Sequence, residues 1–516
     1  MRTTLYQRSK ASKKALITLP LWLALLLSVV AGACFMLSLA PFGFWGVALI
    51  SVMVLYVMLC TNISAKQAFL IGEAYGFGLW ATGAFWLYTS IHQYGDISAP
   101  LALVMIGLMA LIMGLFHAFL AWGFVRFLGR QPLAFASLWV VQEWLKTWLL
   151  TGFPWLFAGY AFTEVPIITT LAPVVGVLGI SFVVVLLAAS MVEVLRKKWG
   201  YLVISGVPLL GALALYITNP AWTTPTGKTL SVSLVQGNIP QDLKWLTEFQ
   251  EKTLAIYATL SQNEWGRDVV IWAEGAIPMF QDDAWPFLSE AAHIAKAHNS
   301  AFVTGIPYKD LEAFDPITDE YPPFYNSVIA LGQATGIYKK QNLVPFGEYI
   351  PMAGLLDILP NLAGNQAVAS HSQGKKNQAP IDIKGQKMGV AICYEVAYPD
   401  TTRQNAKDSA FLLTVSNDAW FGTSAGPYQH LQMVQMRALE TGRWIARGTN
   451  TGVTAIINDK GKIVAKAPQF EPAVLRGDVK MMIGTTPFMR FGSYPVLVLV
   501  VILIGLSALA KSRQRS

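Results

Sequence analysis

Three residues of complementary chemistry lie at the ends of stretches that are typical of β-strands. Glu274 lies near the end of "DVVIWAEG", Lys340 follows a predicted hairpin over 326–340, and Cys393 lies near the end of "MGVAICYE". A thiol needs a base or a cationic neighbour before it becomes a nucleophile. A carboxylate can carry the proton, and an ammonium can stabilise the oxyanion that develops during attack on a carbonyl. The set predicts nucleophilic catalysis by a cysteine if the fold brings the three ends together, which spacing alone does not establish.

The small number of cysteines also bears on this prediction. Cys34 and Cys60 fall in apolar runs, and Cys393 is the one cysteine in the more polar part of the sequence. If that part lies outside the cytoplasm, its compartment favours disulfides, and Cys393 has no partner there. An unpaired thiol in that setting is either buried and inert or a working nucleophile, and the count leaves both open.

The elements that would position these residues alternate between strands and helices. Predicted strands cover 230–240, 268–275, 301–307, 326–332, 388–395 and 410–418, and helical patterns cover 242–264, 284–298 and 427–442. This alternation indicates an α/β fold whose interior strands are covered on both faces. Polar residues at strand ends are the candidates for catalysis in such folds.

The rest of the chain is too apolar for an ordinary soluble protein. Of 516 residues, 54% are hydrophobic and 13% are charged, with a mean hydropathy of +0.46. A helix needs about 20 mostly apolar residues to cross a bilayer. Eight crossings are predicted, at 15–37, 45–61, 68–90, 100–127, 132–152, 167–194, 199–218 and 493–510. Because further spans follow the first directly, we do not interpret it as a cleaved signal peptide.

The distribution of the basic residues predicts the orientation. Lysines and arginines precede the first span, follow the last, and occupy the loops between spans two and three, four and five, and six and seven. The alternate loops, around 38–44, 91–99 and 153–166, contain none. By the positive-inside rule both termini are cytoplasmic, and the polar domain lies on the opposite side, which is the periplasm in a bacterium. The net charge of +8 is therefore no sign of nucleic-acid binding.

Together these patterns predict a polytopic α-helical membrane domain with an external α/β domain. The predicted organisation is a basic cytoplasmic N-terminus (1–14), a transmembrane domain (15–218), an external catalytic domain (229–480), a C-terminal span (493–510) and a basic cytoplasmic tail (511–516). The six histidines lack paired ligand spacing, and neither a P-loop nor a Rossmann fingerprint occurs, so no metal and no cofactor are expected. The polar stretch 361–380 is predicted to be an exposed loop and a candidate lid.

The positions of Glu274, Lys340 in "KKQNLVPFGEY" and Cys393 in "ICYE" resemble the Glu-Lys-Cys set of the carbon–nitrogen hydrolase (nitrilase) superfamily. With eight predicted spans, the chain resembles a membrane-bound family of that superfamily, the apolipoprotein N-acyltransferases. The resemblance covers nearly the whole chain, through "LAPFGFW", "SIHQYG", "TGFPWL", "LVQGNIPQDLKW", "VSNDAWFG", "RWIARGTNTGVTA" and "MRFGSYP". It departs at Ala273, where superfamily members often have proline. The resemblance implies an αββα sandwich for the external domain.

The resemblance also implies an activity, the last step of bacterial lipoprotein maturation at the inner membrane. The Cys393 thiolate would attack an acyl ester of a phospholipid, typically phosphatidylethanolamine, and release lysophospholipid. The amino group of a diacylglyceryl-cysteine at an apolipoprotein N-terminus would then open the thioester. Glu274 would act as general base and acid, and Lys340 would stabilise the oxyanion with the backbone N–H of Tyr394. No cofactor is implied, and a monomer is expected.

Supporting residues follow from the same matching. Glu348 and Glu395 correspond to acids near the family's catalytic centre, and we expect Glu348 to orient Lys340 or Glu274 because an unpaired buried ammonium is costly. Tyr394, Trp245 and Trp420 match aromatic positions near the site, although such residues also gather at membrane interfaces.

Two charged residues in the fifth predicted span stay ambiguous. Glu143 and Lys146 are three residues apart and share one helix face. Charges inside a membrane suggest function, but a structural ion pair or a lysine reaching the interface would also explain them.

Two other functions are compatible with parts of the sequence. A membrane-tethered amidase or nitrilase would use the same three residues and let water open the thioester, but a soluble amide needs no multi-span domain. A transporter with an external regulatory domain predicts internal repeats or broken helix pairs. No convincing repeat occurs, and the catalytic set would have no role in a transporter.

Overall fold

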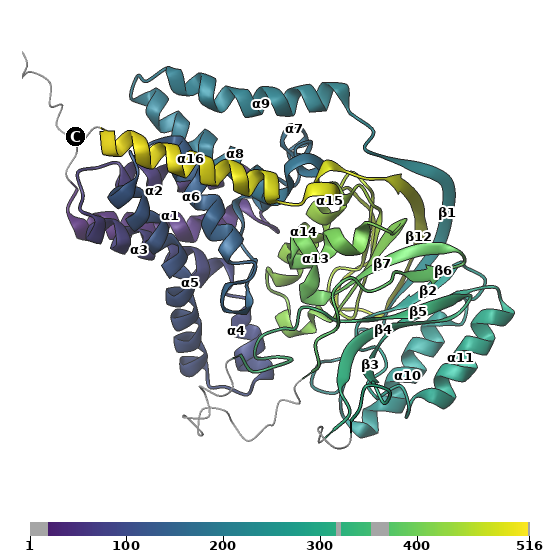
Figure 1. Cartoon of the computed structure of the whole chain (residues 1–516). Coiled ribbons are helices and arrows are strands. Elements are labelled where there is room, and N and C mark those ends of the chain that lie inside the picture. Colours follow the sequence, from purple (N-terminus) through teal and green to yellow (C-terminus); the bar gives the residue numbers. More distant parts are fainter. Residues whose placement is uncertain (1–18, 316–320, 352–370, 514–516) are drawn as a thin grey trace, which may run out of the picture.

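The computed structural model describes residues 19–315, 321–351 and 371–513 (Figure 1). Three predicted segments lie wholly or partly outside the described residues. They are the N-terminal segment 1–14, residues 514–516 of the tail and residues 361–370 of the predicted loop 361–380. One side of the molecule consists of helices, and the other contains the strands together with the helices that flank them, as Figure 1 shows.

A helix occupies part of each of the eight predicted spans. These helices are α1 (Leu21–Phe35), α2 (Trp45–Leu59), α3 (Ala65–Gly83), α5 (Ala99–Phe127), α6 (Pro132–Leu145), α8 (Ala172–Leu195), α9 (Gly200–Thr218) and α16 (Tyr494–Arg513). Within the described ranges, five are long and apolar enough to cross a membrane: α1 extended to Ser38, α5, α8, α9 and α16. The chain is therefore a membrane protein, while the number of eight crossings stays a prediction, because α2 and α6 are only 15 and 14 residues long.

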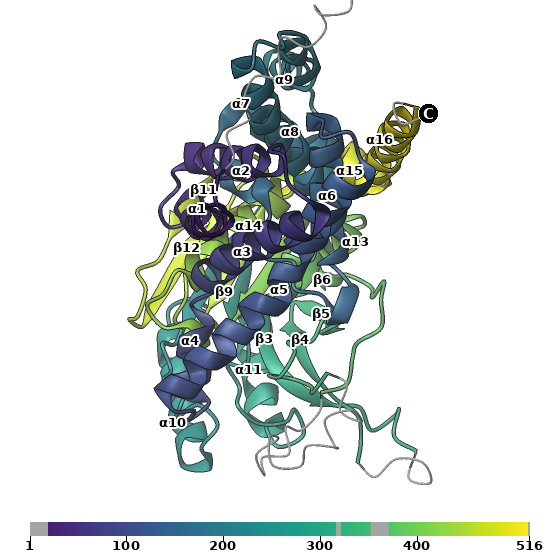
Figure 2. The same cartoon turned by 90° about the vertical axis from the view of Figure 1, so that its left-hand side faces the viewer.

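Small residues allow the membrane helices to approach closely. A Cβ added at Gly72 of α3 would lie 2.3 Å from the carbonyl oxygen of His117 in α5, and one at Gly32 of α1 would lie 2.0 Å from that of Tyr75. Helix association in lipid relies on such contacts because apolar burial gives little driving force there. Helix α3 is thus held between α1 and α5 (Figure 2).

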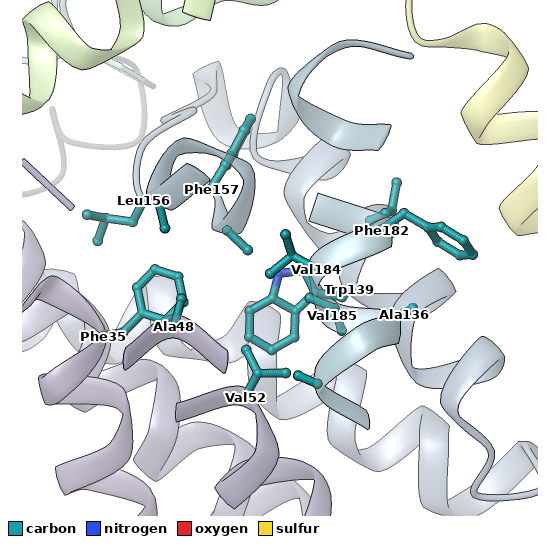
Figure 3. Close-up of a cluster of buried hydrophobic side chains, with 14 of the residues drawn as sticks. Phe35, Ala48, Val52, Ala136, Trp139, Leu156, Phe157, Phe182, Val184 and Val185 are labelled. Carbon is teal, nitrogen blue, oxygen red and sulfur yellow. The ribbon is translucent and has the colours of Figure 1, made fainter. Parts of the chain in front are cut away.

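The centre of the helical domain is a packed apolar cluster, shown in Figure 3. Phe35 of α1, Val52 of α2 and Trp139 of α6 surround side chains of α8 such as Val184, and all four are buried. The cluster also includes Leu156 and Phe157, which belong to the loop after α6. The later part of that loop is consequently fixed in the interior, while residues 148–151 are exposed.

In its described residues, the α/β domain contains twelve strands in one continuous order, β11-β10-β9-β8-β7-β6-β5-β4-β3-β2-β1-β12. The strands are β1 (Thr223–Gln236), β2 (Val269–Trp272), β3 (Ala301–Lys309), β4 (Phe324–Gly332), β5 (Ala334–Lys339), β6 (Ile381–Ile383), β7 (Gln386–Ile392), β8 (Phe411–Ser416), β9 (Ile445–Thr449), β10 (Ala455–Ile457), β11 (Ile463–Lys466) and β12 (Ala473–Gly484). The pairs β1–β2, β2–β3, β7–β8 and β8–β9 are parallel, and the other pairs are antiparallel.

The sheet folds over so that its two halves pack face to face. Leu234 and Ile271 from one half share a buried core with Leu413 and Ala446 from the other. Helices α10 (Thr247–Ser261) and α11 (Trp285–Ala297) cover one outer face, and α13 (Pro399–Ala406) and α14 (Gly426–Thr441) cover the other, which faces the membrane helices (Figure 1). The predicted αββα sandwich is confirmed.

Short helices complete the chain. They are α4 (Leu87–Thr89), a π-helix (Ser90–Tyr94), α7 (Pro166–Thr169), α15 (Pro487–Phe491) and 3₁₀ turns at Met36–Ser38, Leu149–Thr151, Ala158–Phe162, Cys393–Ala397 and Asp418–Phe421.

Helix α14 docks the sandwich on the membrane domain. Its Glu440 accepts a 2.7 Å hydrogen bond from the backbone N–H of Val177, directly after a break in α8 at Gly176. Gly176 has φ +65, and a Cβ there would lie 2.3 Å from the ring of Phe488. A carboxylate from the external domain thus satisfies the N–H that the break leaves free.

Candidate active site

Three predicted site residues lie where strands end in the sandwich. Glu274 follows β2, Lys340 directly follows β5, and Cys393 directly follows β7. Strand β2 and the last five residues of β7 are apolar and buried, so the first polar positions after them are the ones that can face a site.

Lys340 lies between two carboxylates. Its Nζ is 2.9 Å from Oε1 of Glu348 and 3.4 Å from Oε1 of Glu274, and its side chain is 1% exposed. Asn326 of β4 donates from Nδ2 to the same two oxygens at 2.8 Å each. Burial lowers the pKa of Lys340, but the charges of Glu348 and Glu274 outweigh it and hold the pKa above the usual value. Lys340 is therefore an ammonium.

Both carboxylates are held in place by backbone donors as well. The N–H of Val344 donates to Oε2 of Glu348 at 2.8 Å, and the N–H of Asn417 donates to Oε2 of Glu274 at 2.7 Å. Burial raises the pKa of Glu348, but the charge of Lys340 overrides this and lowers it. Glu348 is therefore ionised and in direct contact with Lys340.

Cys393 begins the 3₁₀ turn Cys393–Ala397 with φ +53, in the left-handed region that side chains rarely adopt. Its pKa is raised, first by burial and then by the charge of Glu274, while Lys340 opposes the rise in part. The three residues therefore act on one another electrostatically within one site. Because the thiol is protonated at neutral pH, it needs a base during attack.

Glu395 ties the turn of Cys393 to the loop after Lys340. It is fully buried, and its carboxylate accepts from the N–H of Ile392 at 2.7 Å, Gln341 at 2.5 Å and Asn342 at 3.0 Å. The hydroxyl of Tyr338 donates to it as well, at 3.0 Å. Burial raises the pKa of Glu395 to about 7, against the effect of these hydrogen bonds.

The side chain of Tyr394 contacts the membrane domain. Its hydroxyl donates to the carbonyl of Gly152 at 3.0 Å, and its ring stacks on Trp155 with centroids 6.4 Å apart and an interplanar angle of 15°. Both partners belong to the loop after α6. Tyr394, the residue after Cys393, thus links the site to the helical domain.

The two predicted tryptophans border the site more loosely. Trp245 is 51% exposed, and its ring lies next to Gly275, the residue after Glu274. Trp420 is 41% exposed, and its carbonyl accepts from the hydroxyl of Ser90 at 2.8 Å. Trp420 is therefore at the junction with the π-helix, and no contact joins it to the three central residues.

The sequence-based prediction missed several polar residues of this centre. Asn326 bridges the two carboxylates, and Lys244 donates to the carbonyl of Glu274 at 2.9 Å. Burial lowers the pKa of Lys244 to about 8, with the charges of Glu274 and Cys393 opposing. The only sequence signal for Lys244 was its place in "LVQGNIPQDLKW". Asn326 gave no signal, because nothing in the sequence distinguishes it from the other residues of its strand.

Glu143 and Lys146 are both buried but do not pair with each other among the described contacts. Oε1 of Glu143 accepts from Trp139 at 2.9 Å and from the N–H of Ala158 at 2.7 Å. Nζ of Lys146 lies 5.2 Å from the ring centroid of Phe157. Among the described contacts neither structural alternative is seen, because the two side chains form no ion pair and Lys146, at 1% exposure, does not reach the interface. No cluster of three or more histidine, cysteine or acidic residues suited to a metal occurs in the described ranges.

Comparison with known proteins identifies this arrangement. Residues 31–190 match the apolipoprotein N-acyltransferase N-terminal domain, and residues 231–487 match the carbon-nitrogen hydrolase domain. The solved structure of Saccharomyces cerevisiae Nit3, a member of branch 10 of the nitrilase superfamily, is similar at 18% identity and a TM-score of 0.36, over 49% of this chain and 90% of that one.

Curated relatives match over nearly the whole length. The apolipoprotein N-acyltransferase of Pseudomonas syringae pv. tomato is 41% identical over 96% of this chain and 98% of its own. That of Vibrio parahaemolyticus is 37% identical over 90% of this chain and 93% of its own. The sandwich and its site define a membrane-bound enzyme of the nitrilase superfamily. Within that class, the chain belongs to the apolipoprotein N-acyltransferase family.

Proposed function

We propose that Cys393 is the nucleophile, Glu274 the general base and acid, and Lys340 the oxyanion donor of an acyl transfer from a phospholipid to an apolipoprotein. The buried ammonium between two carboxylates, beside a protonated thiol, supports these roles most strongly. It combines a proton acceptor, a fixed positive charge and a nucleophile in one small volume.

In the first half-reaction, Glu274 takes the thiol proton as Sγ of Cys393 bonds to the ester carbonyl carbon. Lys340 and the backbone N–H of Tyr394 stabilise the resulting oxyanion. The carbon–oxygen bond then breaks, Glu274 returns the proton to the leaving oxygen, and lysophospholipid departs. A thioester remains on Cys393.

In the second half-reaction, the α-amino group of the apolipoprotein's diacylglyceryl-cysteine attacks the thioester carbon. Glu274 takes a proton from the amine, the carbon–sulfur bond breaks, and the proton passes to Sγ. The amide product is a triacylated lipoprotein. Splitting the transfer in two makes each step easier than a direct attack of an amine on an ester.

The connection between site and membrane domain favours lipid substrates over a small soluble amide. Tyr394 follows the nucleophile directly and contacts Gly152 and Trp155 of the helical domain. A hydrolase of small amides would need neither this contact nor the helices. The acyl donor is phosphatidylethanolamine and the acceptor is a diacylated apolipoprotein.

The charge pattern supports a location in the bacterial inner membrane, with both termini cytoplasmic and the sandwich in the periplasm. Lysines and arginines occupy one set of loops and are missing from the alternate set. A monomer suffices for this site, because all three central residues come from one chain.

An acceptor with a blocked amine tests this proposal. The purified enzyme is mixed with phosphatidylethanolamine carrying a labelled sn-1 chain and with a diacylated lipopeptide, either free or acetylated at its amine. We expect label on the free lipopeptide only, and none with the Cys393→Ser variant. Label released as free fatty acid in both mixtures would instead establish a hydrolase, and phosphatidylglycerol acting better than phosphatidylethanolamine would refute the donor.

A further inference from the structure

A buried histidine contacts the backbone of Cys393. His430 belongs to α14 and is 1% exposed. Its Nε2 lies 3.0 Å from the backbone carbonyl oxygen of Cys393. A carbonyl oxygen only accepts hydrogen bonds, so Nε2 must carry a proton and donate to it.

The other side of the imidazole is held by an ion pair. Nδ1 of His430 lies 3.0 Å from Oδ1 of Asp418 and 3.2 Å from Nη2 of Arg447. Arg447 donates to Oδ2 of Asp418 at 2.6 Å, and the hydroxyl of Ser416 donates to Oδ1. Burial raises the pKa of Asp418, but Arg447 and His430 outweigh it and hold the pKa well below its usual range. These contacts fix the imidazole ring of His430 in one orientation.

The carbonyl that His430 holds belongs to the same peptide plane as the N–H of Tyr394. A trans peptide unit is planar, so its C=O and N–H point in opposite directions. Fixing the carbonyl of Cys393 toward α14 therefore aims the N–H of Tyr394 away from α14. This N–H lies in the first turn of the 3₁₀ segment Cys393–Ala397, where N–H groups have no partner within the turn.

The backbone at this point also needs support. Cys393 has φ +53, and non-glycine residues keep such a conformation only when surrounding contacts hold it. The turn is held from two sides. Glu395 accepts from the N–H of Ile392 before the nucleophile, and His430 donates to the carbonyl of the nucleophile itself.

We propose that His430 is a positioning residue that sets the peptide between Cys393 and Tyr394, so that the N–H of Tyr394 faces the developing oxyanion. Asp418 and Arg447 act through it by fixing the ring. The hydrogen bond also polarises the peptide, which makes its N–H a stronger donor. This inference rests on the proposed function, because it assigns the Tyr394 N–H to the oxyanion of acyl transfer.

Two reactions of the same thiol separate positioning from general disruption. Thioester formation passes through an oxyanion, whereas alkylation by iodoacetamide is a displacement at a saturated carbon and needs none. In His430→Phe, which keeps a ring but loses the donor, we expect thioester formation in a single turnover to slow by about 10- to 100-fold. Alkylation of the Cys393 peptide, followed by mass spectrometry, should stay within about twofold of wild type because the thiol and Glu274 are unchanged.

His430→Gln retains an N–H donor and should recover at least half of the lost rate on a logarithmic scale. His298→Phe, a change at an exposed histidine of the outer layer, should leave both rates unchanged. If His430→Phe does not accumulate, His430→Leu removes the same hydrogen-bond donor. The rates of thioester formation and of alkylation are then compared in that variant.

Wild-type thioester formation in the His430→Phe variant would overturn the inference, and so would an equal fall in alkylation and acylation. Failure of wild type itself to form a thioester would refute the proposed function instead, so the two failures are distinguishable.

Discussion

Lys340 is held by Glu348 and Glu274 in a buried site, so its ammonium is ready to meet an oxyanion. Loss of one oxyanion donor costs about 10²–10³ in rate. We therefore expect Lys340→Ala to slow acyl transfer by about that factor, measured as labelled lipopeptide formed per minute.

The adjacent lysine is the matched control for that change. Lys339 pairs with Asp310 and lies over the ring of Tyr325, and it does not pair with the two glutamates that hold Lys340. Lys339→Ala should retain activity within about twofold, since partly exposed ion pairs contribute little. Equal losses in the two alanine variants would mean that Lys340 has no special role.

Glu274 affects the thiol in two opposite ways. Its charge raises the pKa of Cys393, and yet its carboxylate is the proposed base for acyl transfer. Glu274→Gln should therefore slow thioester formation by about 10²–10⁴ and lower the pKa of the thiol. At a fixed alkaline pH the variant should react with iodoacetamide faster than wild type. A slower alkylation at that pH would show that the carboxylate does not repel the thiolate.

At the scale of elements, much of the sandwich could be predicted from the sequence, because strands such as β2 and β8 are continuous apolar runs bounded by turn formers. Strand β12 was missed, since its exposed and buried positions are mixed and its partner β1 lies some 250 positions earlier in the chain.

The same contrast holds for the site. Glu274, Lys340 and Cys393 could be found because polar residues directly follow recognisable strands and match a family pattern. His430 could not, because it lies in the middle of α14, where a histidine is ordinary and only the tertiary fold brings it to Cys393. Tyr394 was matched as an aromatic near the site, but its contact with Gly152 depends on docking that no local pattern encodes.

Glu395 connects two elements, the turn after β7 and the loop after β5, and burial raises its pKa from 4.5 to about 7. The folded protein then holds this proton more tightly than the unfolded chain does. The resulting stabilisation, of order 3 kcal/mol, is present below about pH 4.5 and is lost as pH rises through about 7. Wild type in detergent should thus lose thermal stability between about pH 5 and pH 8 more steeply than Glu395→Gln. Parallel curves for the two proteins would contradict this coupling.

At the scale of the whole molecule, the orientation proposed from the charge pattern makes a direct prediction. Ser64 is exposed before α3, and Lys460 is exposed between β10 and β11. In a chain with Cys34→Ala, Cys60→Ala and Cys393→Ser, a membrane-impermeant maleimide added to spheroplasts should label Lys460→Cys and spare Ser64→Cys. The reverse labelling would place the sandwich in the cytoplasm.

The docking of the sandwich through α14 and Tyr394 brings Cys393 next to a set of membrane helices. This arrangement suits an enzyme whose two substrates both carry lipid, because each can reach the site without leaving the bilayer. The proposed reaction connects the two substrates, because an acyl group passes from the phospholipid to Cys393 and then to the amine of the lipoprotein.

The mass of the Cys393 peptide after incubation with phosphatidylethanolamine tests that claim most directly. We predict an added acyl mass that neutral hydroxylamine removes, and that disappears when diacylated lipopeptide is added, as triacylated product forms in equal amount. The Cys393→Ser variant should show no hydroxylamine-labile mass. An active wild-type enzyme without the acyl mass, or an acyl group that lipopeptide does not discharge, would contradict the account.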